Sequence, residues 1–234
     1  TKRHPSDIRL AVGCDETGRI SGFVFDGIFN TGAYASWGPT VANRVPIHAS
    51  GPYATKDYRA NSVAVHTNAP PAGAFRGFGV PQSAVAQECA FDLLAEKLGM
   101  DRLAFRRLNA LKNGIPTVTG QVFNSGVGID DCFAALENSW HAAVLSAASF
   151  NQTAISDNSP WRKGVGIASC WYGCGNTSLP NPSTMRMGIT ADGRIVLHQG
   201  AMDIGQGANT VITQIAADAL GVPVHDVHIL GGDT

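Results

Sequence analysis

The residues best suited to chemistry form a glycine-rich stretch, Gly73-Ala74-Phe75-Arg76-Gly77-Phe78-Gly79-Val80-Pro81-Gln82, in which Arg76 lies between two aromatic residues. A guanidinium carries a permanent positive charge and a planar fork of donors, and glycines let backbone approach a ligand closely. A helix is predicted directly after the stretch, and its N-terminus would add N–H groups and a dipole that favour an anion. The stretch is therefore a candidate ligand site. A tight loop whose aromatics fill the core is an equally supported interpretation.

A second candidate is Met202-Asp203-Ile204-Gly205-Gln206-Gly207-Ala208-Asn209-Thr210, where a predicted strand gives way to a glycine turn and a helix. The Gln206 amide has both donor and acceptor atoms, so it can recognise the edge of a heterocycle. The start of the helix can hold a phosphate or another electron-rich group. A strand–helix turn capped by polar residues is the alternative.

Other patterns fail on inspection. The run from Gly173 to Ser178 imitates the start of a dinucleotide fingerprint, but Pro180 and Pro182 prevent a helix from opening there. Cys170 and Cys174 have no second pair to complete a zinc site. No Ser–His–Asp arrangement, P-loop or HExxH motif is present. The sequence thus predicts no protein metal ligands and no self-contained catalytic constellation.

The elements that must position these residues are two hairpins and several helices. Turn residues between apolar, β-prone runs predict the hairpins, and residues 30–81 are interpreted as functional loops with one short strand-like run. Helical spacing and capping residues predict the helices. The predicted elements are a hairpin at 8–30, a strand-like run at 63–68, helices at 81–99, about 101–111, about 130–148 and about 207–220, and strands at 164–170, 184–190 and 195–199.

Strands and helices are partly segregated, which favours an α+β fold of mixed sheets with packed helices. Residues 1–150 are expected to form a first subdomain. The Ser- and Asn-rich residues 151–160 are expected to be a linker, and residues 161–234 the start of a second subdomain.

The composition narrows the class of protein. The formal net charge is −1 over 234 residues, which argues against a nucleic acid or an anionic membrane as the partner. Only 15% of residues are charged, which indicates surface buried against other chains or domains. The five scattered cysteines fit a reducing, cytoplasmic compartment, and no apolar run is long enough to span a membrane. Thr1 and the strand-like C-terminus suggest an internal piece of a longer chain.

The combination of the two glycine-rich motifs resembles the molybdopterin-binding subunit of the xanthine dehydrogenase and aldehyde oxidase family. The resemblance covers essentially the whole chain and is closest to nicotinate dehydrogenase-like members, because of the run from Trp171 to Pro182. Further matching segments are Thr1-Lys2-Arg3-His4-Pro5, Thr31-Gly32-Ala33-Tyr34, Gly51-Pro52-Tyr53 and Thr119-Gly120-Gln121.

The resemblance implies a molybdenum ion held by a pterin dithiolene, in the cytosine dinucleotide form usual for bacterial members, with no protein ligand to the metal. Electrons would leave through Fe-S clusters to FAD on partner domains or subunits. The implied partners are the rest of the molybdenum subunit, an Fe-S subunit and an FAD subunit. The implied substrate is a small nitrogen-heteroaromatic compound, with purines or aldehydes as alternatives. A non-catalytic domain that only shapes a cofactor site is the alternative from another class.

The site residues follow from the motifs by resemblance. Arg76 matches the arginine that orients the metal's oxygen ligands, and Phe78 matches an aromatic that packs on the substrate ring. Arg44 falls where xanthine-oxidising members place a substrate-polarising arginine. The other cofactor-contacting matches are Phe75, Gly77, Ile204, Gly205 and Gln206.

Two departures qualify the match. The second aromatic clamp of xanthine-type enzymes should lie near Asn176, where this chain has Gly-Cys-Gly-Asn-Thr, so Tyr172 or Trp171 is the expected replacement. The family's glycine-rich segment would precede Thr1, and its general-base glutamate would follow Thr234. The chain by itself is therefore expected to be inactive.

Overall fold

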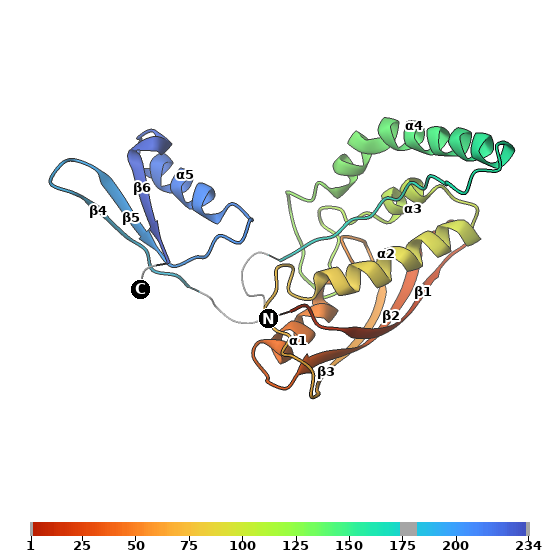
Figure 1. Ribbon diagram of the computed structural model, residues 1–234, viewed down its shortest axis with the longest axis horizontal. Helices are drawn as coiled ribbons and strands as arrows, with labels where there is room; N and C mark the ends of the chain where they lie inside the picture. The colour runs from red at the N-terminus through yellow and green to blue at the C-terminus, as the bar shows by residue number, and fades with distance from the viewer. Residues whose placement is uncertain (1, 174–181, 233–234) are drawn as a thin grey trace. The chain divides into compact units, whose positions relative to one another are not determined.

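The computed structural model describes residues 2–173 and 182–232, and they form two compact units (Figure 1). The first unit comprises Thr1–Tyr172 and the second Gly173–Thr234. Each unit contains a small mixed sheet with helices packed on it, so the predicted α+β class is confirmed. In the described part of the chain, no helix has the length and hydrophobicity needed to cross a membrane.

The sheet of the first unit has the order β1-β2-β3. β1 (Ser6–Cys14) and β2 (Ile20–Gly32) form the predicted antiparallel hairpin, and β3 (Asp57–His66) lies parallel to β2. The Asp15 carboxylate holds the hairpin turn by accepting from the backbone N–H groups of Thr17 and Arg19 at 2.9 and 3.0 Å. Alternate β2 residues point into the core, with Phe23, Phe25 and Phe29 at most 1% exposed.

Four helices complete the first unit. The crossover from β2 to β3 is α1 (Gly38–His48), which packs on β2 and β3, while α2 (Val80–Lys97) packs on β1. A shorter helix, α3 (Arg102–Asn109), begins at Asp101, whose side chain accepts from the Ala104 N–H as expected for an N-cap. The long α4 (Ile129–Ser156) packs against α3 and buries one side chain in every seven, from Phe133 to Ala154.

Three predictions of local structure were wrong. Residues 30–81 contain α1 and a ten-residue β3 in place of loops with one short strand. The prolines at positions 39 and 46 hide α1 in the sequence, although the first turn of a helix tolerates a proline and Val41, Ala42 and Val45 on its buried face are apolar. Residues 151–156, expected in a linker, continue α4, because Ala154 keeps its buried stripe going.

The third wrong prediction concerns residues 164–170, which belong to no ladder among the described strands. Their side chains nevertheless alternate between half-buried and exposed, as in an extended strand. Val165 and Ile167 pack against the core of the first unit. This segment therefore lies on the protein through its side chains and not through a sheet.

The second unit has the strand order β4-β5-β6. β4 (Arg186–Ile189) and β5 (Ile195–Gln199) form the predicted second hairpin, and β6 (Val227–Gly231) lies parallel to β5. The predicted helix is α5 (Ala208–Leu220), followed by a short 3-10 turn, η1 (Val224–Asp226). A small core forms where α5 packs on the sheet, around Leu197, Ala217 and Val227.

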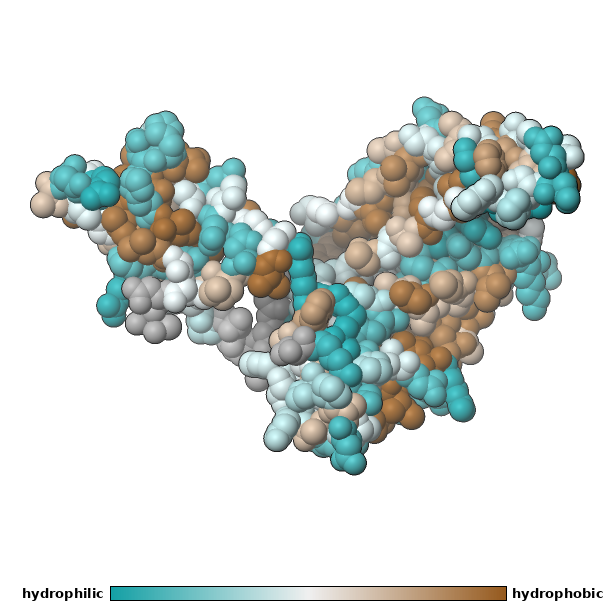
Figure 2. Space-filling view, in the orientation of Figure 1, coloured by the Kyte–Doolittle hydropathy of each residue, from teal (hydrophilic) through white to brown (hydrophobic). Residues whose placement is uncertain are grey.

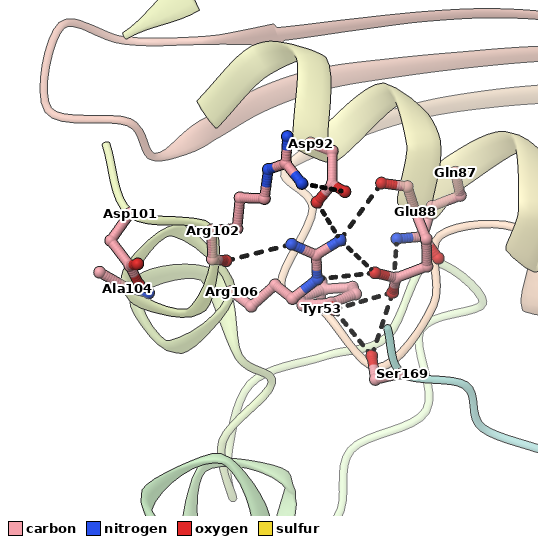
Figure 3. Close-up of polar contacts among 9 residues, drawn as sticks. All are labelled: Tyr53, Gln87, Glu88, Asp92, Asp101, Arg102, Ala104, Arg106 and Ser169. Carbon is pink, nitrogen blue, oxygen red and sulfur yellow. Dashed lines mark hydrogen bonds and ion pairs between the residues drawn. The ribbon is translucent and has the colours of Figure 1, made fainter. Parts of the chain in front are cut away.

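A buried ion-pair network joins distant parts of the first unit (Figure 3). The Arg106 guanidinium is completely buried and lies 2.7 Å from Glu88 Oε2 and 2.8 Å from Asp92 Oδ1. The other Glu88 oxygen accepts from the hydroxyls of Tyr53 at 2.9 Å and Ser169 at 3.1 Å. Burial by itself would lower the pKa of Arg106, but the Glu88 charge together with the hydrogen bonds to Glu88 and Asp92 raises the pKa above its ordinary value. The network ties α3, α2, the loop of Tyr53 and the 164–172 segment together.

Removing the Arg106 charge is expected to destabilise the protein strongly. Arg106→Met leaves the buried Glu88 carboxylate without its cation, which should cost about 3–5 kcal/mol in the free energy of unfolding. Urea unfolding measures this loss. The control Arg59→Met breaks an exposed pair of 3.9 Å with Asp26 and should cost about 0–1 kcal/mol. Equal losses for the two variants would contradict the importance of the buried network.

Candidate functional site

The glycine-rich loop before α2 has an unusual backbone at three successive residues. Gly77, Phe78 and Gly79 have φ values of 93°, 44° and 97°, a region that favours glycine. A Cβ on Gly79 would lie 2.6 Å from Val45 Cγ2 on α1, and one on Gly77 would lie 2.8 Å from Pro81 Cγ. The glycines are thus required for the loop to seat against α1 and the start of α2. Close approach of a ligand was the reason expected for these glycines from the sequence.

A second guanidinium supports the loop. Arg3 Nη1 donates to the Arg76 carbonyl at 2.9 Å, and the Arg3 guanidinium carbon lies 4.6 Å from the centre of the Phe75 ring. The Arg76 side chain is exposed, and Phe75 is 45% exposed. The loop therefore presents a cation and an aromatic ring at the surface of the first unit. Arg3 was recognised in the sequence only as part of a segment that matches the family, and its contact with Phe75 was not predicted.

Helix α1 carries one predicted substrate residue, Arg44, and together with its N-cap contacts the other two, Phe78 and Tyr172. Trp37, the N-cap of α1, contacts Phe78 edge to face with ring centroids 6.5 Å apart. Two turns further on, the Arg44 guanidinium lies over the Tyr172 ring, 4.9 Å from its centroid. The sequence separates Arg44 from Tyr172 widely, yet the structure brings them into contact. Tyr172 is 50% exposed, so its ring remains accessible to a ligand.

His48 completes this cluster and was not anticipated from the sequence. Its ring stacks on Tyr172 at 5.4 Å with an interplanar angle of 11°, and its carbonyl accepts from Trp171 Nε1 at 3.3 Å. The ring is buried, and burial lowers the pKa of His48, with the nearby Arg44 charge acting in the same direction. The imidazole is therefore neutral at physiological pH. The spacing of Arg44 and His48, four residues apart on one helix face, is the only sequence signal for this pair.

The position of Tyr172 depends on the ion-pair network. Ser169, three residues earlier, lies 2.7 Å from the Tyr53 hydroxyl and donates to Glu88 at 3.1 Å. Burial, together with the Glu88 charge, raises the pKa of Tyr53 well above its usual range, so its hydroxyl keeps its proton. The 164–172 segment is thus fixed at Ser169 and again at Trp171, and Tyr172 follows directly.

In the second unit, both polar atoms of the Gln206 amide form hydrogen bonds within its own turn. Its Oε1 accepts from the Ile204 N–H at 2.6 Å, and its Nε2 donates to the Met202 carbonyl at 2.8 Å. The Asp203 carboxylate accepts from the N–H groups of Gly205 at 2.8 Å and Asn209 at 3.2 Å. A carboxylate therefore already lies at the start of α5, where a phosphate was considered. Ile204 is exposed, and the turn presents it together with polar backbone and amide groups.

The two groups of predicted cofactor residues lie in different units, and each is described within its own. The group of Phe75, Arg76 and Gly77 belongs to the first unit. The group of Ile204, Gly205 and Gln206 belongs to the second. The expected replacement of an aromatic clamp near Asn176, and Cys174, lie outside the described residues.

The donor set suits a polar heterocycle. Among the described residues, no group of three His, Cys, Asp or Glu side chains is placed to hold a metal ion. Within the first unit, the glycine-rich loop offers a guanidinium and backbone groups, which match the nitrogen and oxygen atoms of a pterin. Two buried polar atoms near the glycine-rich loop, His4 Nε2 and Gln82 Oε1, also lack a hydrogen-bond partner. Such unused polar capacity fits a site that a polar ligand and its ordered water complete.

Comparison with known proteins identifies the class. Two family models, each described as a molybdopterin cofactor-binding domain, match residues 1–110 and 135–234. A xanthine dehydrogenase molybdenum-binding subunit of Escherichia coli O157:H7 is 33% identical over 231 residues, 97% of this chain. The chain therefore belongs to the molybdopterin-binding part of the xanthine dehydrogenase and aldehyde oxidase family.

Two more proteins are similar to this chain, one in sequence and one in structure. The large molybdopterin subunit of nicotinate dehydrogenase from Eubacterium barkeri is 43% identical over 129 residues, 55% of this chain. The structure of an aldehyde oxidoreductase from Desulfovibrio desulfuricans superposes with a TM-score of 0.81 at 26% identity, covering 98% of this chain and 25% of that one. The chain spans about 30% of the length of the two sequence relatives.

Acidification is expected to destabilise the Tyr172 cluster through His48. Because the pKa of buried His48 lies below its ordinary value of 6.5, the unfolded chain binds a proton that the folded chain excludes. Stability should therefore fall as the pH drops through about 6.5 and below. His48→Asn removes the titrating ring, so its melting temperature should fall less than that of the wild type between about pH 7.5 and about pH 5.5.

Thermal unfolding at the two pH values measures this difference. His141→Asn, at an exposed histidine on α4, is the matched control and should keep the wild-type acid sensitivity. Identical acid sensitivity in the wild type and His48→Asn would remove His48 as the cause.

Proposed function

We propose that the full-length protein is a molybdenum hydroxylase that acts on a nitrogen-heteroaromatic acid resembling nicotinate. The observation that carries this proposal is the contact of Arg44 with the exposed ring of Tyr172 in the first unit. An aromatic surface beside a permanent cation suits a flat ring with an anionic substituent. The 43% identity to a nicotinate dehydrogenase subunit supports the same substrate class.

The described residues would have different roles in binding the cofactor and the substrate. Arg76 and Phe75 in the first unit, and the Ile204–Gln206 turn in the second, would hold the molybdopterin. Phe78 and Tyr172 would stack on the substrate ring, each contact contributing roughly 0.5–1.5 kcal/mol beyond burial. Arg44 would bind the substrate's carboxylate through charge-assisted hydrogen bonds. His48, neutral beneath Tyr172, would position that ring without adding charge.

The cofactor, when bound, supplies the redox chemistry by accepting the electron pair released as a ring carbon is hydroxylated with oxygen from water. We assign it the cytosine dinucleotide form. Fe-S and FAD partner domains or subunits would carry the electrons away, in the cytoplasm. The general base is expected in the remainder of the molybdenum subunit, so the chain of 234 residues alone should show no turnover.

Purines and aldehydes remain the alternative substrates. The xanthine dehydrogenase relative and the aldehyde oxidoreductase structure represent these classes. Turnover of the full-length protein with nicotinate, xanthine and an aldehyde distinguishes them. A protein free of molybdenum after expression in a cofactor-producing host would instead indicate a domain without catalytic function.

Tyr172→Phe in the full-length enzyme should raise the KM for a heteroaromatic acid and leave the KM for a simple aldehyde nearly unchanged. The variant keeps the ring over Arg44 and loses only a hydroxyl, which can bind a polar substituent. Loss of one such hydrogen bond corresponds to a roughly 2- to 10-fold change in KM. Tyr34→Phe, at another exposed tyrosine, is the matched control. Equal changes for both substrates, or none for either, would assign Tyr172 to packing.

Gln206→Ala should lower the molybdenum and pterin content of the full-length enzyme. The substitution removes both hydrogen bonds that shape the turn as well as any contact of the amide with the pterin. Hydrogen bonds of this kind amount to roughly 1–3 kcal/mol. Elemental analysis and pterin fluorescence measure the content, and circular dichroism checks the fold. Gln214→Ala, exposed on α5, should keep full content; the same result for Gln206→Ala would leave that side chain without a cofactor role.

A further inference from the structure

The two units repeat one order of elements. In the first, a hairpin (β1–β2) is followed by a helix (α1) and a strand (β3) parallel to the second hairpin strand. In the second, the hairpin β4–β5 is followed by α5 and by β6, which is parallel to β5. In both sheets, the second hairpin strand lies in the middle. The units can therefore be compared element by element.

In the first unit, two helices share one face of the sheet. The helix of the crossover, α1, covers β2 and β3, and α2, which follows β3, covers β1. Leu10 and Val12 of β1 lie opposite Phe25 and Phe23 and are partly buried against the core. A helix is about 10 Å wide and neighbouring strands lie about 4.8 Å apart, so three strands require two helices.

Among the described residues of the second unit, α5 is the only helix that covers the corresponding face. Met187 and Ile189 of β4 lie opposite Leu197 and Ile195, so their side chains point to the same face of the sheet as those core residues. Leu197, under α5, is 2% exposed, whereas Met187 is 45% and Ile189 76% exposed. Hydrophobic residues are visible on the surface of this unit in Figure 2. The β4 third of the face therefore lacks the cover that α2 gives to β1.

We propose that the apolar face of β4, formed by Met187 and Ile189, is the docking site of an amphipathic helix that follows β6 in the full-length protein, as α2 follows β3. The comparison between the units specifies both the kind of partner and its place in the sequence. β4 is an edge strand, but a strand paired to its backbone edge would leave the side chains of Met187 and Ile189 uncovered. A helix with an apolar stripe packs on the sheet face and covers them. The matched segment of 231 residues is 30% of the xanthine dehydrogenase subunit of Escherichia coli O157:H7, so that relative has ample further length for such a helix.

Thiol reactivity in the full-length protein tests whether the apolar face of β4 is covered. Ile189→Cys should react with an alkylating reagent at least 10-fold more slowly than Gly188→Cys, which lies on the same strand but points to the opposite face. A Cβ on Gly188 meets no atom within 4 Å, so the control substitution is accommodated. Peptide mass spectrometry separates these thiols from the natural cysteines. Equal reactivity of the two introduced cysteines would overturn the proposal.

A photocrosslinker attached to Ile189→Cys then identifies the occupant. The expected crosslinks fall roughly 15 to 30 residues beyond β6, the separation at which α2 follows β3. Crosslinks that lie only in another segment, in a partner subunit or in a second copy of the chain would overturn the proposal. Protection that disappears on dilution would likewise assign the face to a second copy.

Discussion

The buried charge of Arg106 is the constraint on which the first unit depends. A guanidinium without solvent must have anionic partners, and only α2 supplies them, through Glu88 and Asp92. Glu88 in turn collects hydroxyls from two regions remote in sequence, at Tyr53 and Ser169. An apolar contact would tolerate sliding between these segments, but a saturated set of charged hydrogen bonds fixes their register. This arrangement therefore fixes the position of the aromatic cluster at Tyr172.

The helix α1 brings together the residues of the proposed recognition surface. It seats the glycine-rich loop against Val45, contacts Phe78 through Trp37, and offers Arg44 and His48 to Tyr172. The loop and the extended segment approach the same helix from different parts of the chain. A single short helix therefore sets the spacing of groups that the sequence separates by up to about 130 residues.

The sequence predicted the hairpins, α2, α3 and α5, because turn residues, caps and apolar periodicity were all local. Prediction failed where local residue preferences disfavoured an element that tertiary packing stabilises. Prolines concealed α1, and polar residues concealed the end of α4 around Ala154. The motif residues Arg76 and Gln206 could be singled out from their neighbours. The Arg44–Tyr172 contact, the support from Arg3 and the role of His48 depend on long-range packing, for which a single sequence holds no signal.

The backbone of Phe78 has a consequence for how this protein can change. A φ of 44° is strained for an aromatic residue, at a cost of about 1–3 kcal/mol, whereas glycine or asparagine would adopt it readily. Selection for thermal stability alone would therefore favour losing the ring. A melting experiment would register that gain in stability but not a contribution of the ring to ligand binding. Programmes that stabilise the protein by relieving backbone strain should leave this position untouched, because stability and recognition oppose each other there.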